Sequence, residues 1–448
     1  MTRRTAGTTR TPWEDTVTAD PRTALLVLAY DSQLRWARAL GAALEAQGWR
    51  CRYAAPSDVR SFVAPELEKS LGVSVERAPW TELVRQAAAS DALVLALQGP
   101  LTSRFAQDLA ASGDAGVRPV VVTGWVGVVI EKLVAGYLER FASDVVAVNS
   151  REDLRSFEAA GAHLGLPTDN LLLSGLPLLP PRPAPPRRGP VRTVMFADQP
   201  TVPSSRAERL YLYDRLVEHA RRHPERRVLI KPRHRPAEDP FQVVRHHPEE
   251  LLAGVVLPSN VEVVYDPVPD LLPEVDLLLT VSSTAGLEAV GAGVRTVFVA
   301  DLGVHENLGN HVLLPSGLVR TLDVLDGPDE DLPEPDPAWL ADWFVGAPGR
   351  PGVQLVAERV AELTAAPPAE RPFARTTATA TFRARVAVAR HRTHDLPARA
   401  LPGDGSPAPA VRTLRWRQGV RGRVLLACHA VLPTGWQDWP LVDRLRRA

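Results

Sequence analysis

The sequence contains little cysteine and little lysine, and both shortages restrict its function. Of its 448 residues only Cys51 and Cys428 are cysteines, which is too few for a disulfide framework or a cysteine-based zinc site. A reducing, cytoplasmic environment is consistent with this usage. Of the 52 basic residues only three are lysines. Because arginine supplies nearly all of the positive charge, a single arginine is weak evidence of function.

Long apolar runs and a net charge are missing as well. No stretch of 18 apolar residues is present, so we expect no membrane-spanning helix. Residues 1–20, which we expect to be flexible, contain no apolar segment typical of a signal peptide. Basic and acidic residues number 52 each, which disfavours a nucleic-acid-binding protein. The charge is unevenly placed, because residues 371–448 contain 15 arginines and 4 acidic residues, a net +11, and residues 1–370 carry −11.

Four sequence motifs of common enzyme classes are absent. The chain has no Walker-type phosphate-binding loop and no GxGxxG after a predicted strand, which disfavours P-loop and nicotinamide enzymes. It has no GxSxG nucleophile elbow and no HExxH zinc motif. We therefore expect neither a metal ion nor a cofactor.

Short apolar runs alternate with helical patterns in the first part of the chain. Each run is too short for a helix and is bounded by polar residues, as expected of buried strands in a parallel sheet. Together they predict an amino-terminal Rossmann-like domain at residues 21–176. The runs occupy residues 24–29, 50–54, 91–97, 119–123, 144–148 and 170–173.

A proline-rich linker follows at residues 177–190, where seven of fourteen residues are proline and a helix or central strand is excluded. The α/β pattern then returns and predicts a second Rossmann-like domain at residues 191–323. Residues 324–366 are expected to be a Pro/Asp-rich segment ending in a helix, and residues 367–448 a flexible stretch with a basic tail. We predict an α/β fold in which two Rossmann-like domains face a central cleft, with ligands bound at the carboxyl ends of the strands.

The most informative segment is 276–293, in which a buried strand runs into three hydroxyl residues and then a helix. The free N–H groups and positive end of a helix are a suitable seat for phosphate, so we expect the hydroxyls to bind a phosphate group. The alternative is that Ser283 or Thr284 only caps the helix. Gly286 allows the close approach of a ligand or a strand. Glu288 follows one helical turn after Thr284, where its carboxylate would accept hydrogen bonds from the hydroxyls of a ribose. The hydroxyl residues are Ser282, Ser283 and Thr284.

Two further loops of the second half are candidates for binding a phosphate group or a nucleobase. In the loop 231–236, prolines stiffen a group of cations that would neutralise a leaving phosphate, although a solvated basic loop is the alternative. The loop 301–317 carries polar side chains suited to a nucleobase edge, and its spacing disfavours a metal site. The candidate residues are Lys231, Arg233, His234, His305, Asn307 and Asn310.

The first half supplies candidates for an acceptor site. Asp31 follows the first strand and would be a general base on an acceptor hydroxyl, with a helix cap as an equally weighted alternative. Glu131 is a second candidate base. Ser32 and the loop 123–132 would bind the acceptor, with glycines for close approach and a tryptophan for sugar stacking, unless these are turn glycines and a core side chain. The loop residues are Gly124, Trp125 and Gly127.

These residues resemble those of a known enzyme group. The segments KPRHRP (231–236) and SSTAGLEA (282–289) resemble motifs of bacterial capsule- and teichoic-acid-type glycosyltransferases with the GT-B fold, including polysialyltransferases and Kdo transferases. LLLSGLPLL (171–179) is similar to the Gly-x-Pro signal at the end of their first half, and DSQLRW (31–36) to an actinobacterial set of these enzymes. Arg235 interrupts their His-Pro pair, and Leu287 replaces their phenylalanine.

The resemblance implies a metal-independent glycosyltransferase that moves a sugar from a nucleotide-sugar donor to a glycan or lipid-linked acceptor. It implies that His234 and the hydroxyl residues contact the donor phosphate. Two alternatives are a sugar-nucleotide 2-epimerase of the same fold and a non-catalytic nucleotide-sugar-binding protein. The basic tail at residues 411–448 suits an anionic membrane surface, so peripheral attachment to the inner face of the membrane is expected, with a solvated tail as the alternative.

Overall fold

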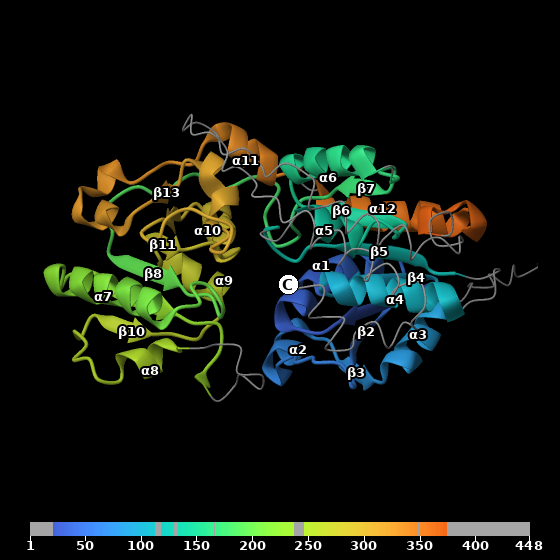
Figure 1. Ribbon diagram of the computed structural model, residues 1–448, viewed down its shortest axis with the longest axis horizontal. Coiled ribbons are helices and arrows are strands. Elements are labelled where there is room, and N and C mark those ends of the chain that lie inside the picture. Colours follow the sequence, from blue (N-terminus) through green and yellow to red (C-terminus); the bar gives the residue numbers. More distant parts are fainter. Residues whose placement is uncertain are drawn as a thin grey trace, which may run out of the picture.

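The computed structural model describes residues 21–112, 118–129, 133–164, 166–236, 246–347 and 350–373. Within them the two predicted α/β units form two lobes, coloured blue to teal and green to orange in Figure 1. The predicted fold class is confirmed. The candidate base Glu131, the amino-terminal residues 1–20 and the basic tail 411–448 lie outside the described residues.

The first lobe contains a seven-stranded sheet in the order β3-β2-β1-β4-β5-β6-β7, and every neighbouring pair of strands is parallel. The central strands β1, β4, β5 and β6 are buried on both faces, which explains their continuous apolar sequence. The strands are β1 (Thr23–Leu28), β2 (Arg50–Pro56), β3 (Val75–Ala78), β4 (Ala92–Ala96), β5 (Val120–Gly124), β6 (Val145–Val148) and β7 (Leu171–Leu173).

Helices cover both faces of this sheet. In β1, Leu26 and Leu28 pack toward α1, whereas Leu25 and Val27 pack toward α3 and α4. Alternate residues of the strand therefore belong to two different cores, as the pleat requires. The helices are α1 (Asp31–Glu45), α2 (Pro65–Leu71), α3 (Trp80–Ala88), α4 (Gly99–Ser112), α5 (Leu133–Leu138) and α6 (Arg151–Leu164).

The second lobe repeats the design with a six-stranded parallel sheet in the order β10-β9-β8-β11-β12-β13. Helix α7 packs on one face, and α9 and α10 pack on the other. The elements are β8 (Thr193–Ala197), α7 (Arg206–Arg222), β9 (Arg227–Lys231), α8 (Pro248–Leu252), β10 (Val261–Val263), α9 (Val268–Leu271), β11 (Leu277–Thr280), α10 (Ala285–Gly291), β12 (Arg295–Val299) and β13 (Val319–Arg320).

The chain then crosses back to the first lobe. Helix α11 (Pro337–Trp343) packs on the second lobe, the short pair β14 (Gly346–Ala347) and β15 (Arg350–Pro351) follows, and α12 (Gly352–Ala365) packs against α1. In Figure 1, α12 lies in orange among the teal elements. The expectation of flexibility from residue 367 is wrong for 367–373, since Phe373 is buried in the first lobe and its N–H donates to Asp144 Oδ1 at 2.8 Å.

The proline-rich linker is fixed to the second lobe rather than suspended between the lobes. Ala184 N donates to Gly291 O at 2.9 Å, and Arg187 N donates to Gly293 O at 2.8 Å, so the linker pairs with the end of α10. The guanidinium of Arg187 also donates to the carbonyls of Leu272 and Val275. These bonds and the stiffness of proline make the linker a defined wall of the second lobe.

Candidate functional site

Each sheet has a topological switch point where ligands of such folds bind. In the first sheet it lies between β1 and β4, whose following helices α1 and α4 cover opposite faces. In the second it lies between β8 and β11, followed by α7 and α10 on opposite faces. The segments after β1, β5, β9 and β11 meet where the two lobes touch, and we call this region the interdomain site.

Two hydrogen bonds join the lobes at this site. Arg233 Nη2, after β9, donates to Ser32 Oγ, at the start of α1, over 3.2 Å. Val128 N, after β5, donates to Thr284 Oγ1, before α10, over 3.3 Å. Residues separated by 201 and 156 positions are therefore in contact, as the predicted arrangement of two facing sheets requires.

Asp31 occupies the first position of α1, but it does not cap this helix. The cap residue is Tyr30, and Gln33 Oε1 accepts the N–H groups of Ala29 and Tyr30 at 2.7 and 3.1 Å. Asp31 Oδ1 instead accepts the N–H of Ala64 at 2.9 Å. The capping alternative is therefore wrong, and the negative charge of Asp31 acts on the nearby guanidinium of Arg233.

Arg233 is the cation that reaches the other lobe. It is exposed to water, yet protein atoms of both lobes crowd its guanidinium, and this desolvation lowers the pKa of Arg233 while the nearby Asp31 opposes the change. Lys231 is buried, and its Nζ donates to Pro232 O at 2.7 Å. The predicted group of phosphate-binding cations is thus divided, with Lys231 holding the loop and Arg233 facing the site.

His234 is held through its backbone. His247 Nε2 donates to His234 O at 2.9 Å, and His247 Nδ1 accepts the N–H of Glu249 at 3.2 Å, which fixes the neutral tautomer that carries hydrogen on Nε2. His247 is buried and caps α8. Sequence analysis did not single it out, because its partners are backbone atoms that no spacing reveals.

The three consecutive hydroxyls serve three different purposes. Ser282 is 1% exposed, and its Oγ donates to Leu308 O at 2.6 Å, so the prediction that it contacts phosphate is wrong. Ser283 Oγ accepts the N–H of Ala285, the first residue of α10, at 3.3 Å, whereas the cap residue Thr284 makes no side-chain cap bond. Gly286 N also bonds to Ser283 O. With these amides occupied, the start of α10 is a poorer phosphate seat than predicted, and Thr284 is the hydroxyl that faces the other lobe.

Glu288 lies one turn along α10 from Thr284. Within the described part of the chain its half-buried carboxylate accepts no side-chain or backbone hydrogen bond. Burial raises the pKa of Glu288 to about 7, and the positive charge of Arg35 across the interface opposes this rise. Arg35 belongs to α1 in the other lobe. It was missed because arginine is too abundant in this sequence to stand out.

A buried network supports the loop before α10. Arg209 and Asp198 form an ion pair of 2.8 Å, and their side chains are 1% and 2% exposed. Arg209 also donates to the carbonyl of Gln199. Gln199 Oε1 in turn accepts the N–H of Ser282 at 2.9 Å. The end of β8 therefore fixes the loop after β11, and sequence analysis missed Asp198 and Gln199 because their partners lie far along the chain.

The proposed acceptor loop is largely internal. Trp125 is 9% exposed, stacks on Phe157 with centroids 4.6 Å apart and carries the guanidinium of Arg140 over its ring at 4.5 Å. Its role as a sugar platform is therefore wrong, and the core alternative holds. A Cβ on Gly124 would lie 2.8 Å from Trp36, so Gly124 is a packing glycine and not an acceptor contact. Gly127 does reach the interface, where its Cβ would lie 2.6 Å from Thr284 Oγ1.

Two other predicted donor residues are also structural. A Cβ on Gly286 would lie 2.4 Å from Phe298 of β12, so the glycine permits strand packing rather than ligand approach. Asn310 is fully buried and bonds to His305 N, Val299 O and Gly303 O. It therefore shapes its loop and does not contact a ligand, whereas His305 and Asn307 are exposed on that loop.

Two further observations concern the described residues alone. No group of three or more His, Cys, Asp or Glu side chains among them is arranged to hold a metal ion. No helix among them combines the length and the apolar character that crossing a bilayer demands.

Comparison with known proteins identifies similarity in both sequence and fold. A family model described as "Putative glycosyltransferase (DUF6716)" matches residues 24–363. No curated protein sequence matches the chain. A structure described as "putative UDP-N-acetylglucosamine 2-epimerase from Listeria monocytogenes" has a TM-score of 0.50 and 10% identity, and the match covers 78% of this chain and 97% of that chain.

Two structures with bound sugar nucleotides are also similar, at lower scores. UGT89C1 of Arabidopsis thaliana, complexed with UDP-L-rhamnose, has a TM-score of 0.44 and 14% identity over 81% of this chain and 99% of that chain. The UDP-GlcNAc 2-epimerase of Neisseria meningitidis, bound to UDP-GlcNAc, has a TM-score of 0.44 and 9% identity over 76% and 100%. The two parallel sheets, the family model and the similarity to the Listeria structure at a TM-score of 0.50 together identify a GT-B-type fold of two Rossmann-like domains.

Proposed function

The chain belongs to this family of glycosyltransferases, and from that premise we propose that it transfers a sugar from a nucleotide-sugar donor to an acceptor hydroxyl. One observation carries the proposal: Arg233 of the second lobe contacts Ser32 of the first lobe, beside Asp31. A cation and a carboxylate thus come together from the two lobes at the carboxyl ends of both sheets. Glycosyl transfer needs these two charges.

Arg233 would neutralise the departing phosphate. When the bond between sugar and phosphate breaks, negative charge develops on phosphate oxygens, and a positioned guanidinium stabilises it through paired N–H donors. Arg233 has the right charge and reaches across the interface from the donor lobe. A cation in this role supplies what a metal ion supplies in other transferases, so the proposed reaction is metal-independent.

Asp31 would take the proton of the acceptor hydroxyl. Its Oδ1 is bonded to Ala64 N, which fixes the orientation of the carboxylate. The proton leaves the hydroxyl as its oxygen bonds to the anomeric carbon, and the donor nucleotide leaves with the electron pair of the broken bond. Such general-base assistance contributes about 10²–10⁴ in rate.

Glu288 and Thr284 would bind the nucleotide part of the donor. Glu288 accepts no hydrogen bond within the described residues and lies beside Thr284 on the donor lobe, so its carboxylate is available to the two hydroxyls of a ribose. The exposed His305 and Asn307 would contact the base from their own loop. We propose a cell-surface glycan or lipid-linked molecule of the capsule type as the acceptor, with the enzyme acting in the cytoplasm at the inner face of the membrane.

A matched pair of variants tests this assignment. Asp31 and Asp58 each accept one backbone N–H, of Ala64 at 2.9 Å and of Trp80 at 2.8 Å, but Asp58 has no place in the proposed chemistry. Asp31→Asn should lower kcat by about 10²-fold or more, whereas Asp58→Asn should stay near the wild type. Nucleotide release from UDP-, GDP-, CDP- and CMP-sugars in the presence of lipid and glycan acceptors is the measurement.

The similar fold of the Listeria structure, described as a 2-epimerase, makes epimerisation the second candidate function. An epimerase would convert the donor sugar, or release the nucleotide, with no acceptor present. Chromatography of the sugar products separates the two functions. Sugar found on an acceptor supports transfer, and a C2 epimer formed without acceptor supports the second candidate.

A further inference from the structure

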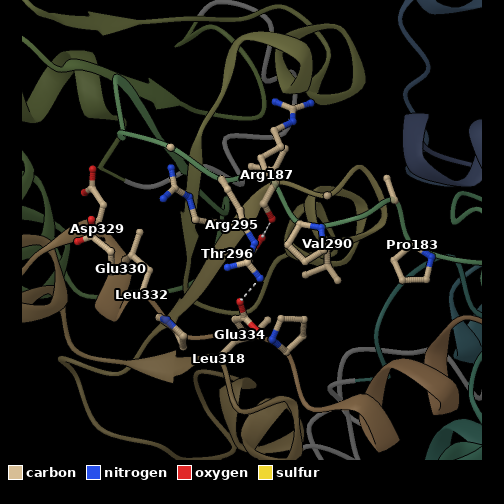
Figure 2. A pocket seen from close by; sticks show the side chains of 18 of the residues that line it. Pro183, Arg187, Val290, Arg295, Thr296, Leu318, Asp329, Glu330, Leu332 and Glu334 are labelled. Atoms are coloured by element: carbon tan, nitrogen blue, oxygen red, sulfur yellow. Dashed lines mark hydrogen bonds and ion pairs between the residues drawn. The ribbon is translucent and has the colours of Figure 1, made fainter.

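A cavity of about 570 Å³ lies in the second lobe between the linker and residues 329–335. It is formed at the amino end of β12 and the carboxyl end of α10, away from the strand ends that make the interdomain site. Figure 2 shows Pro183 on one side and Asp329 and Glu330 on the other, with Arg295 and Thr296 between them. Its volume is in the range of small-molecule sites, about 300–1,000 Å³.

Both walls of this rear cavity are held in place. The linker wall is bonded to α10 through Ala184 N and Arg187 N. The opposite wall is held by Asp329, whose oxygens accept from Val191 N at 2.7 Å and from Arg226 Nη2 at 3.0 Å. Because backbone bonds and a half-buried ion pair fix the walls, the cavity is pre-formed and a ligand does not have to open it.

The lining combines apolar surface with an excess of positive charge. Val290, Leu318 and Leu332 supply apolar side chains, and the linker adds proline rings. Four arginines and three acidic residues line the cavity, and two ion pairs, Arg226–Asp329 and Arg188–Glu334, account for two of each. The remaining charges are Arg187 and Arg295 against the exposed Glu330.

Arg295 is the group suited to bind an anion. Its Nε donates to Asp276 O at 3.4 Å, which orients the guanidinium. Among the described residues its two terminal nitrogens have no hydrogen-bond or ion-pair partner. Arg187 contrasts with it, because its Nη1 already donates to backbone carbonyls. A half-buried, oriented guanidinium with unused donors recognises a carboxylate, sulfonate or phosphate.

We propose that the rear cavity binds a small apolar or aromatic molecule that carries one anionic group, with the apolar part between the linker and Leu332 and the anion on Arg295. This site is separate from the proposed glycosyl transfer and does not depend on it. Since the linker and the last turn of α10 form part of the cavity, an occupant would contact the helix that carries Glu288.

Two related fluorescent probes test the proposal with the full chain. The first is 8-anilinonaphthalene-1-sulfonate, which has aromatic rings and one anion, and the second is N-phenyl-1-naphthylamine, which has similar rings and no charge. Titrations are made with and without an excess of UDP, GDP, CDP and CMP, so that any binding of a probe at the interdomain site is recognised and not counted. We expect each probe to bind with one saturable site per chain.

Two variants test separately the positive charge that would bind the anion and the volume that would hold the apolar part. Arg295→Gln should weaken binding of the sulfonate about tenfold, since a hydrogen bond to a charged group is lost, and leave the neutral probe unchanged. Ala184→Trp, at an exposed position that lines the cavity, should fill it and abolish binding of both probes. Arg320→Gln and Ala253→Trp, at exposed positions elsewhere on the lobe, are the controls and should bind as the wild type does.

The following results would show that the rear cavity does not bind such a molecule. The proposal is overturned if neither probe shows saturable binding, or if Ala184→Trp binds both probes as its control does. Equal weakening of both probes by Arg295→Gln would contradict the assignment of the anion to Arg295. Circular dichroism and thermal unfolding of each variant establish that a lost signal comes from the cavity and not from a loss of structure.

Discussion

Glu288 is the side chain of the interdomain site whose charge depends most on its surroundings. Burial raises the pKa of its carboxyl to about 7, with Arg35 acting in the opposite direction. A raised pKa means that the carboxyl is largely protonated below about pH 7 and ionised above it. The ionised form accepts stronger hydrogen bonds from hydroxyl groups than the neutral form does.

We therefore expect nucleotide binding to tighten between about pH 6 and about pH 8 and then to level off. Glu288→Gln keeps the shape but not the ionisation, so it should remove this pH dependence. Calorimetric titrations of both proteins at several pH values make the measurement, and the difference between them cancels the titration of the nucleotide itself. A wild-type profile that parallels the variant would contradict the proposed role of Glu288.

The sequence predicts which residues lie at the carboxyl ends of the strands. It does not predict which of those side chains form bonds inside the protein. Asp31, Ser32 and Arg233 follow strands of parallel sheets, and the rule that such ends meet at one edge agrees with the contact between Arg233 and Ser32. Ser282, Asn310 and Trp125 follow the same rule, but their polar or aromatic groups are used inside the protein. The sequence does not reveal which internal partner a side chain will have, because these partners come from distant elements.

A buried ion pair connects the residue after β8 to helix α7. Asp198 follows β8, Arg209 lies on α7, and both side chains are almost completely buried. Burial raises the pKa of Asp198, and the charge of Arg209 opposes this. A buried pair of this kind often adds little net stability relative to apolar residues, whereas removing one partner leaves an uncompensated charge.

Arg209→Met should therefore lower the free energy of unfolding by about 3–5 kcal/mol. Asp198→Leu combined with Arg209→Met removes both charges and should recover most of that loss. Urea unfolding monitored by tryptophan fluorescence measures both variants. If the double variant is as unstable as Arg209→Met alone, the ion pair contributes more than this account allows.

Strands and helices were the best-predicted level of the structure. The apolar runs at 24–29, 91–97 and 276–281 correspond to β1, β4 and β11 within one residue at each end, because strands buried on both faces have a continuous apolar sequence. The return of α12 to the first lobe was not predicted. Its apolar face is equally compatible with either lobe, and only the contact with α1 shows which one it covers.

One of the contacts between the two lobes, the bond from Val128 N to Thr284 Oγ1, lies beside a glycine, Gly127. A Cβ at Gly127 would lie 2.6 Å from Thr284 Oγ1, closer than side chains approach one another. Any side chain at this position would move Thr284 or separate the lobes, and the bond from Val128 N would be lost. The absence of a side chain at this position leaves room for the bond from Val128 N to Thr284 Oγ1.

Gly127→Ala should lower sugar-nucleotide turnover several-fold and leave the unfolding transition within about 1 kcal/mol of the wild type, since replacing glycine by alanine also restricts the unfolded chain. Gly254→Ala is the control, because nothing lies within 4 Å of the added Cβ. Turnover and small-angle scattering of both variants are the measurements. Equal turnover in the two variants would show that the contact is dispensable.

The balanced charge of the whole chain has a different meaning once the charges are located. The cation predicted to bind phosphate, Arg233, lies within an acidic body, and the basic excess belongs to residues 371–448. The proposed sugar chemistry belongs to the acidic body, and attachment of the basic tail to an anionic surface stays a prediction. The architecture was predictable as two facing domains, whereas their contact points required the structure.

Calorimetric titration of the full chain with UDP, GDP, CDP and CMP tests the central claim most directly. The account predicts that one of these nucleotides binds with one site per chain and that Arg233→Gln weakens its binding at least tenfold, with Arg320→Gln as the unaffected control. Failure of all four nucleotides to bind, or binding that Arg233→Gln leaves unchanged, would contradict it.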